Sequence, residues 1–132
     1  MGSVPRDRAG VASAVNDVSR ELGGTLGVAV TGSIFISLYS PRIAEGFGRI
    51  PGLVDALPVG ALEQARDSVG AAYALALTNP PGVRADAIAA VNDSFMTGFR
   101  AACLVVAVVA FIGSLLALRF LPPHSTSEAE TA

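Results

Sequence analysis

A long stretch without charged residues lies in the first third of the chain. It covers Leu22–Ser40, and the nearest charged residues on either side are Glu21 and Arg42. A helix of this length spans roughly 30 Å at about 1.5 Å per residue, which matches the hydrocarbon core of a bilayer. The pattern predicts a helical lead-in that continues into a first transmembrane helix, over residues 9–40.

A second stretch of this kind lies near the end of the chain. It covers Ala101–Leu118 and is flanked by Arg100 and Arg119. In a helix these two guanidinium groups lie roughly 28 Å apart, so each can reach one membrane interface. We therefore predict a second transmembrane span at about 100–119.

The segment between the two stretches is rich in glycine and proline. We expect Ser40-Pro41 to end the first helix, because proline lacks the N–H group and crowds the preceding turn. Residues 41–84 are then predicted to form a loop with one short amphipathic helix at about 59–77. This helix could rest on the membrane surface or on the other helices, and the sequence leaves both possibilities open. Its predicted apolar face consists of Leu62, Ala65, Val69, Tyr73 and Ala76.

These patterns predict an all-α membrane protein with two transmembrane helices joined by a long extracytoplasmic loop. Short flanks with an excess of arginine tend to stay in the cytoplasm, and Arg6, Arg8 and Arg119 favour that side for both termini. The predicted location is the cell membrane. The other predicted segments are a cytoplasmic amino-terminal segment over 1–8, a long helix over 85–121 that contains the second span, and a disordered cytoplasmic tail over 122–132.

Two other interpretations of the apolar stretches remain open. The stretches could be buried core helices of a soluble protein, although uncharged runs of this length are unusual in so short a chain. The first stretch could also belong to a secretory signal peptide. The acidic residues Asp7, Asp17 and Glu21 argue against it, because signal peptides begin with a positively charged region.

The composition supports a membrane protein and excludes several kinds of site. Of the 132 residues, 52% are hydrophobic and 15% are charged, whereas an average soluble domain carries roughly 25% charged residues. Nine basic and 11 acidic residues give a net charge of −2, so we expect no nucleic-acid partner. One cysteine and one histidine exclude an internal disulfide and the common zinc-ligand sets. Without an enzyme or cofactor motif, we expect neither an enzyme nor a bound cofactor.

Small residues recur on one face of the first predicted transmembrane helix. Four of them are spaced four residues apart, and two further glycines form an adjacent stripe. A face with almost no side chains lets a neighbouring membrane helix approach closely. The alternative is a flexible or kinked helix without a partner. The predicted helix-packing face consists of Ser19, Gly23, Gly24, Gly27, Thr31 and Gly32.

A polar cluster precedes this face in the same helix. Asn16 and Arg20 share one side of the helix, and Asp17 and Arg20 are spaced as an ion pair. An acid and an arginine at the membrane edge could serve as a gate or a proton relay. The alternative is interfacial anchoring and hydrogen bonding between helices, which the position of the cluster at the edge of the apolar stretch favours.

A denser pattern joins the polar cluster and the small residues. It consists of Pro5, Ala9, Gly10, Ala12, Ser13, Asn16, Arg20, Leu22, Gly23, Gly24, Gly27, Ala29, Gly32 and Ser33. This block resembles the penultimate helix of the fourteen-span drug/proton antiporters of the major facilitator superfamily, the EmrB/QacA type. The second apolar run, with Phe95, Gly98 and Phe99 at its start, resembles the last helix of that family. The resemblance covers roughly residues 4–123, and its specific part lies within the first 33 residues.

The resemblance implies a polytopic exporter that exchanges a drug or lipophilic compound for external protons, with two inverted-repeat bundles that rock about a central cavity. Since the family has fourteen spans, this chain resembles a carboxy-terminal part that is not expected to transport alone. The implied partners are membrane lipid, the remaining transmembrane helices, a hydrophobic or cationic drug-like substrate, and protons. One alternative is a small autonomous two-span protein that oligomerises through its glycine-rich helix as an adaptor or regulator. Another is a soluble helical interaction domain.

Overall fold

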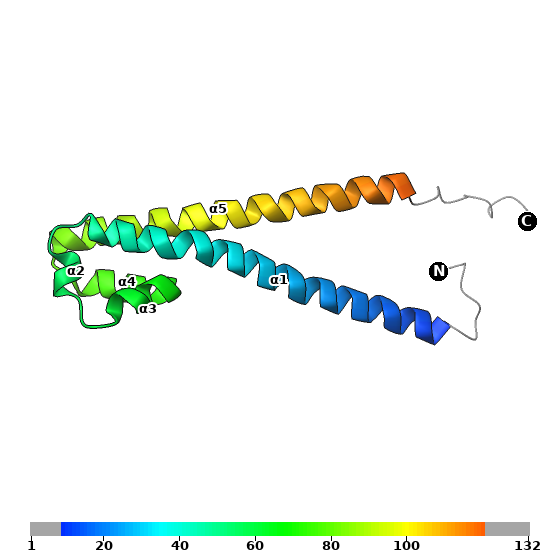
Figure 1. The fold of residues 1–132 in the computed structure, drawn as a ribbon, viewed down its shortest axis with the longest axis horizontal. Helices are drawn as coiled ribbons and strands as arrows, with labels where there is room; N and C mark the ends of the chain where they lie inside the picture. Colours follow the sequence, from blue (N-terminus) through cyan, green and yellow to red (C-terminus); the bar gives the residue numbers. More distant parts are fainter. Residues whose placement is uncertain (1–8, 121–132) are drawn as a thin grey trace, which may run out of the picture.

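The computed structural model describes residues 9–120, which fold into five helices without a strand (Figure 1). The two long helices run antiparallel as a hairpin, and the three short helices lie together at its closed end. The predicted all-α fold with two potential membrane helices is confirmed. The predicted segments 1–8 and 122–132 lie outside the described residues. The helices are α1 (Ala9–Gly48), α2 (Leu53–Ala56), α3 (Ala61–Asp67), α4 (Val69–Thr78) and α5 (Pro81–Phe120).

Helices α1 and α5 are long and apolar enough to cross a membrane. Each has 40 residues, which corresponds to about 60 Å or twice the thickness of the hydrocarbon core. Their most apolar 18-residue windows have mean hydropathies of 1.5 and 2.8, and only 6% of each window is buried. Because a core helix of a soluble protein is covered by its own chain, the interpretation as buried core helices does not fit this part of the chain.

The predicted helix end at Pro41 is wrong, because α1 continues through this proline to Gly48. Proline inside a helix removes one backbone hydrogen bond. Pro41 itself is exposed, whereas side chains on the opposite face pack against α5 and the short helices. This packing offsets the lost hydrogen bond. Because α1 continues to Gly48, the segment that joins the two long helices begins later than the predicted loop at 41–84. The fully buried side chains around the proline are Tyr39, Ile43 and Phe47.

The segment predicted as one amphipathic helix at 59–77 forms two helices, α3 and α4, that meet at Ser68. The backbone of Ser68 is extended (φ −145°, ψ 121°), and its hydroxyl accepts a hydrogen bond from the amide of Ala71 at 3.3 Å, which caps α4. Both helices pack on the hydrophobic core of the hairpin. The five residues of the predicted apolar face all lie in or against that core: Leu62, Ala65, Val69, Tyr73 and Ala76.

Two glycines with positive φ allow the chain to turn between the short helices. Gly52 (φ 73°) precedes α2 and Gly60 (φ 82°) precedes α3. Residues other than glycine rarely adopt this backbone conformation. Helix α5 begins at Pro81, earlier than the predicted position 85. Proline suits the first position of a helix, because its missing N–H has no acceptor there.

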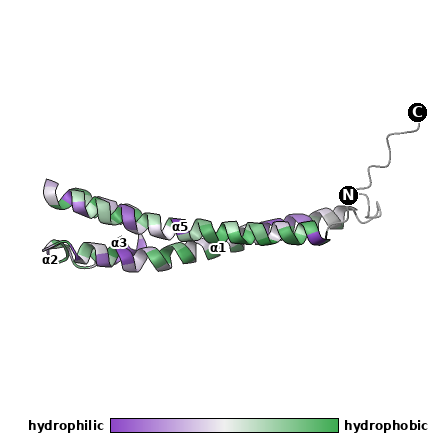
Figure 2. Ribbon diagram, turned by 90° about the horizontal axis from the view of Figure 1, so that it is seen from above, coloured by the Kyte–Doolittle hydropathy of each residue, from purple (hydrophilic) through white to green (hydrophobic). Residues whose placement is uncertain are grey.

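The hydrophobic core lies at the closed end of the hairpin, where all five helices meet. Figure 2 shows hydrophilic residues around this end and a smaller group near the open end, with hydrophobic segments of the long helices between them. The apolar surface along those segments stays exposed, as for Leu104 at 65%. The core residues are Tyr39, Ile43, Phe47, Ile50, Leu53, Ala65, Ala72, Ala76, Ala87 and Val91.

Candidate functional site between the two long helices

Helices α1 and α5 approach each other closely at two glycines. A Cβ atom added to Gly98 would lie 2.9 Å from the carbonyl oxygen of Phe35 and 3.0 Å from its ring. A Cβ atom added to Gly46 would lie 3.0 Å from the Cβ atom of Ala90. Glycine therefore sets the distance between the two helices at both points.

The face of α5 that meets α1 is built from small residues, and it was not among the predicted packing faces. Its members recur at spacings of three and four residues, which is the signal that identified the small-residue face on the first helix. A search for the same pattern in the residues before the second apolar stretch would have found it, since only Ala102 lies within that stretch. The buried residues of this face are Ala87, Val91, Ser94, Gly98 and Ala102.

A row of aromatic rings crosses from α1 to α5 beside this contact. The Phe35 ring is stacked on Tyr39 with a centroid distance of 5.5 Å and meets Phe95 edge-on at 5.6 Å. Phe95 is in turn stacked with Phe99 at 5.7 Å. The Tyr39 hydroxyl donates a hydrogen bond to the carbonyl oxygen of Ala65 at 2.9 Å, which ties α1 to α3. Aromatic pairs of this geometry contribute beyond the area that they bury.

The predicted helix-packing face lies on the part of α1 that diverges from α5 (Figure 1). The hydroxyls of Ser19 and Thr31 donate to carbonyls one turn earlier in the same helix, at 2.8 and 2.7 Å. Thr31 borders α5, whereas Cβ atoms added to the four glycines would meet nothing within 4 Å. The packing role of this face stays a prediction. The four glycines are Gly23, Gly24, Gly27 and Gly32.

The predicted polar cluster lies on the same diverging part of α1. Asn16, Asp17 and Arg20 are all exposed. Since the segment is helical, Asn16 and Arg20 lie one turn apart on one side. Figure 1 shows this end of α1 apart from α5 and from the short helices, so the roles proposed for the cluster stay predictions.

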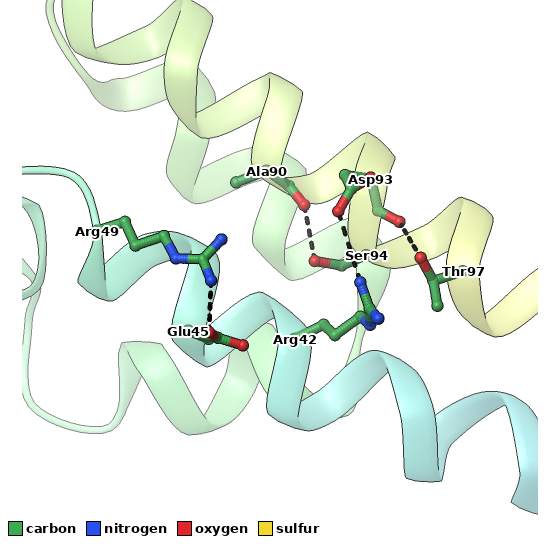
Figure 3. Close-up of polar contacts among 7 residues, drawn as sticks. All are labelled: Arg42, Glu45, Arg49, Ala90, Asp93, Ser94 and Thr97. Atoms are coloured by element: carbon green, nitrogen blue, oxygen red, sulfur yellow. Dashed lines mark hydrogen bonds and ion pairs between the residues drawn. The ribbon is translucent and has the colours of Figure 1, made fainter.

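A charged crevice that was not predicted lies between α1 and α5 near the closed end (Figure 3). It measures about 530 Å³. Arg42 Nη1 lies 3.9 Å from Asp93 Oδ2 across the two helices, and Arg49 pairs with Glu45 along α1. Two positive and two negative side chains balance each other in the crevice. The sequence did not indicate this site, because its pattern predicts a loop from residue 41. In a loop, Arg42, Glu45 and Arg49 would not share one side of a helix.

Replacing Asp93 by asparagine is expected to lower the free energy of unfolding by less than about 1 kcal/mol. The Arg42 and Asp93 side chains are 51% and 79% exposed, so water screens their attraction. The loss should shrink further in high salt. Thermal unfolding of the purified protein at low and high salt measures it, with Asp86→Asn as a control for removing an exposed acid from α5. A loss above about 2 kcal/mol would contradict a screened surface pair.

An apolar groove of about 560 Å³ lies between the same helices, on the side of their diverging ends. Thr31 and Phe35 line it from α1, and two phenylalanines with a run of small apolar residues line it from α5. Cys103 lies on this wall and is exposed. A groove of this chemistry in a hydrocarbon layer fits an acyl chain or side chains of a neighbouring membrane helix.

Within residues 9–120, no three His, Cys, Asp or Glu side chains lie close enough together to hold a metal ion. In the same part of the chain, every buried side-chain nitrogen or oxygen has a hydrogen-bond partner. The hydroxyls of Ser94 and Thr97 beside the crevice donate to carbonyls of their own helix, at 2.7 and 3.0 Å.

Comparison with known proteins relates the chain to part of an efflux pump. It is similar to the multidrug efflux pump LfrA of Mycolicibacterium smegmatis, with 30% identity over 118 residues. The match covers 86% of this chain and 22% of the pump, so the chain spans about a fifth of the length of this relative. No protein-family model and no solved structure matches the chain. The distant match to a transporter and the two apolar helices together favour a membrane protein related to drug export over an enzyme.

Proposed function

We propose that the chain contributes the last two membrane-spanning helices of a proton-coupled multidrug efflux transporter of the major facilitator superfamily. The observation that carries the proposal is the 30% identity to a multidrug efflux pump over 86% of the chain. The length and hydropathy of α1 and α5 support it. Because the match covers 22% of the pump, transport requires a larger set of helices than these two.

In this proposal both termini lie in the cytoplasm and the short helices lie outside. The antiparallel course of α1 and α5 brings the ends that carry α2, α3 and α4 to one side of the membrane. The arginines at the two termini favour the cytoplasmic side for the other ends. The short helices then cap the outer end of the hairpin.

The surfaces of the two helices have separate roles in this transporter. The small-residue face of α1 and the apolar groove receive neighbouring transmembrane helices, since glycines with open space around them admit close approach. The contact between Phe35 and Gly98 joins α1 and α5 into one unit. A rigid pair suits a transporter whose helix bundles rock against each other.

The substrates in this proposal are hydrophobic or cationic drug-like compounds that are exchanged for protons. Proton coupling requires an acidic side chain within the membrane. Residues 101–118 contain no acidic side chain, so α5 does not supply one between its flanking arginines. In the family that the chain resembles, the proton-binding acids lie in other helices, and we assign the coupling acid to those helices.

The size of the native protein tests the proposal first. An antibody against the last ten residues, used on membranes of the native cell, should detect a band several times heavier than 13.4 kDa. A band at 13.4 kDa would overturn the proposal in favour of an autonomous two-span protein. Recovery of the band in the soluble fraction after cell lysis would contradict a membrane protein altogether.

Dye export tests the packing role of the small-residue face. Gly27→Leu in the full transporter is expected to reduce efflux of ethidium several-fold at equal expression, because the leucine fills space that a neighbouring helix needs. Gly10→Leu is the matched control, since its Cβ also meets nothing within 4 Å but lies closer to the start of α1. Equal efflux by the two variants would contradict the packing role.

A further inference from the structure

The contact between Phe35 and Gly98 gives the two long helices a common scale of depth. Both helices rise about 1.5 Å per residue, so a residue before Phe35 lies level with the residue the same number of positions after Gly98. The pairs Arg42–Asp93 and Gly46–Ala90 agree with this register to within three residues. A helix tilt of about 20°, which is typical of membrane spans, shortens these depths by only about 6%.

On this scale the uncharged stretches of α1 and α5 do not coincide. The stretch of α5 between Arg100 and Arg119 lies level with residues 14–33 of α1. The uncharged stretch of α1 begins only at Leu22. Whichever helix sets the position of the bilayer, charged side chains of the other helix therefore fall within the hydrocarbon layer.

The apolar character of α5 decides between the two positions. Its window has a mean hydropathy of 2.8 against 1.5 for α1, and an arginine flanks it at each interface. If α1 set the position instead, Arg100 would lie level with Ser33, about 13 Å inward from Arg42. With α5 in control, Arg20 lies level with Gly113, about 9 Å inward from Arg119, and Asp17 lies about 4.5 Å inward.

Asp17 and Arg20 lie on the side of α1 that faces α5, and Glu21, one turn after Asp17, lies at the border of that side. Asp17, Gly24 and Thr31 are spaced by seven residues and so share one side of the helix, and Thr31 lines the groove against α5. At this depth the helices diverge (Figure 1), and α5 presents apolar residues. The opening between them has charged side chains on the α1 side and apolar side chains on the α5 side. Neither lipid tails nor the apolar side chains of α5 can pair with the charges on α1.

We propose that Asp17, Arg20 and Glu21 lie within the cytoplasmic half of the hydrocarbon layer, and that the opening beside them receives a further membrane helix with a basic side chain. Charges inside a membrane are paired. Arg20 can pair with Asp17 three positions earlier, which leaves the carboxylate of Glu21 for a cation of the partner helix. Gly24 leaves room for the backbone of the partner helix. The inference requires that α1 and α5 cross a membrane, and it is independent of drug export.

Spin labels at matched positions test the depth while the three charges stay in place. In a Cys103→Ser background, the exposed pairs Val18 with Leu115 and Leu22 with Phe111 lie at equal predicted depth. Single cysteines at these positions carry the label, in the full protein reconstituted in phosphatidylcholine and phosphatidylglycerol vesicles. The ratio of oxygen to nickel-chelate accessibility should agree within each pair. Gly10→Cys, beyond the level of Arg119, should report water, and a label at Val18 that matches Gly10 would overturn the proposed depth.

The sign of a stability change tests the partner helix. If a basic side chain pairs with Glu21, Glu21→Gln should lower the thermal unfolding midpoint of the complex purified from native membranes. An unpaired carboxylate would give a rise, because the substitution removes a charge from hydrocarbon, and a rise or no change overturns the pairing. Asp86→Asn controls for loss of an exposed acid. A disulfide through Gly24→Cys that doubles the mass would instead identify a second copy as the occupant. If Glu21 pairs with a basic side chain but the complex does not export dye, the proposed function is contradicted and this inference is not.

Discussion

Replacing Gly98 by leucine is expected to separate α1 from α5 and to lower the free energy of unfolding by about 3 kcal/mol. The first atom of the new side chain would already lie 2.9 Å from the carbonyl oxygen of Phe35 and 3.0 Å from its ring. A backbone oxygen cannot rotate away as a side chain can, so one helix has to move. That movement also breaks the ring contacts of Phe35 with Tyr39 and Phe95, each of which contributes about 0.5–1.5 kcal/mol.

Gly113→Leu provides the matched control for this substitution. It places the same side chain on the same helix, at a glycine whose added Cβ would meet nothing within 4 Å. Thermal unfolding of the purified protein in detergent, followed by circular dichroism, should give a lower midpoint for Gly98→Leu than for Gly113→Leu. Equal midpoints would show that the close approach of the two helices is not required for their packing.

The two long helices could be predicted because their signal is local. Charged residues bracket each apolar stretch, and a bilayer requires that every backbone group bond within its own segment. The end of α1 could not be predicted, because the rule that proline ends a helix is also local and was overridden here. Tyr39 and Phe47 lie on either side of Pro41 and are buried by residues far along the chain. Their burial keeps the intervening backbone helical.

The packing faces show a similar limit. A stripe of small residues indicates that a helix can approach another closely, but it does not name the partner. The stripe on α1 is open around Gly27, whereas the contact with α5 is made at Gly46 and Gly98. The small residues of α5 carry the same signal and could have been found from sequence. Their pairing with Phe35 could not, because it depends on the register of the hairpin.

The charged crevice depends on the same register. Arg42 and Asp93 are far apart in the sequence and meet only because α1 stays helical beyond Pro41 and packs antiparallel to α5. Once the register is known, it also shifts the interpretation of the polar cluster. From sequence alone Arg20 lies at the edge of an apolar stretch, but the depth scale of the hairpin places it level with Gly113, inside the apolar stretch of α5. The depth of a residue in the membrane depends on the register between the two helices, so the sequence of one helix does not determine it.

Replacing Tyr39 by alanine should cause a comparably large loss, about 3–5 kcal/mol in the free energy of unfolding. The side chain is fully buried and stacks on Phe35. Its removal leaves a cavity where α1, α3 and α5 meet, and surrounding groups can fill it only in part. Thermal unfolding in detergent measures the loss, and the short helices should unfold at a lower temperature than the long ones.

Tyr39→Phe separates the hydrogen bond from the packing. It keeps the ring but removes the hydroxyl that donates to the carbonyl oxygen of Ala65 at 2.9 Å. That carbonyl lies in the last turn of α3, where carbonyl groups lack a donor further along the helix. Leaving it unpaired should cost about 1–3 kcal/mol. Tyr73→Phe is the control, because its hydroxyl bonds Asn92 at an exposed position. If Tyr39→Phe cost no more than Tyr73→Phe, the bond between α1 and α3 would be dispensable, and apolar packing alone would hold the short helices on the hairpin.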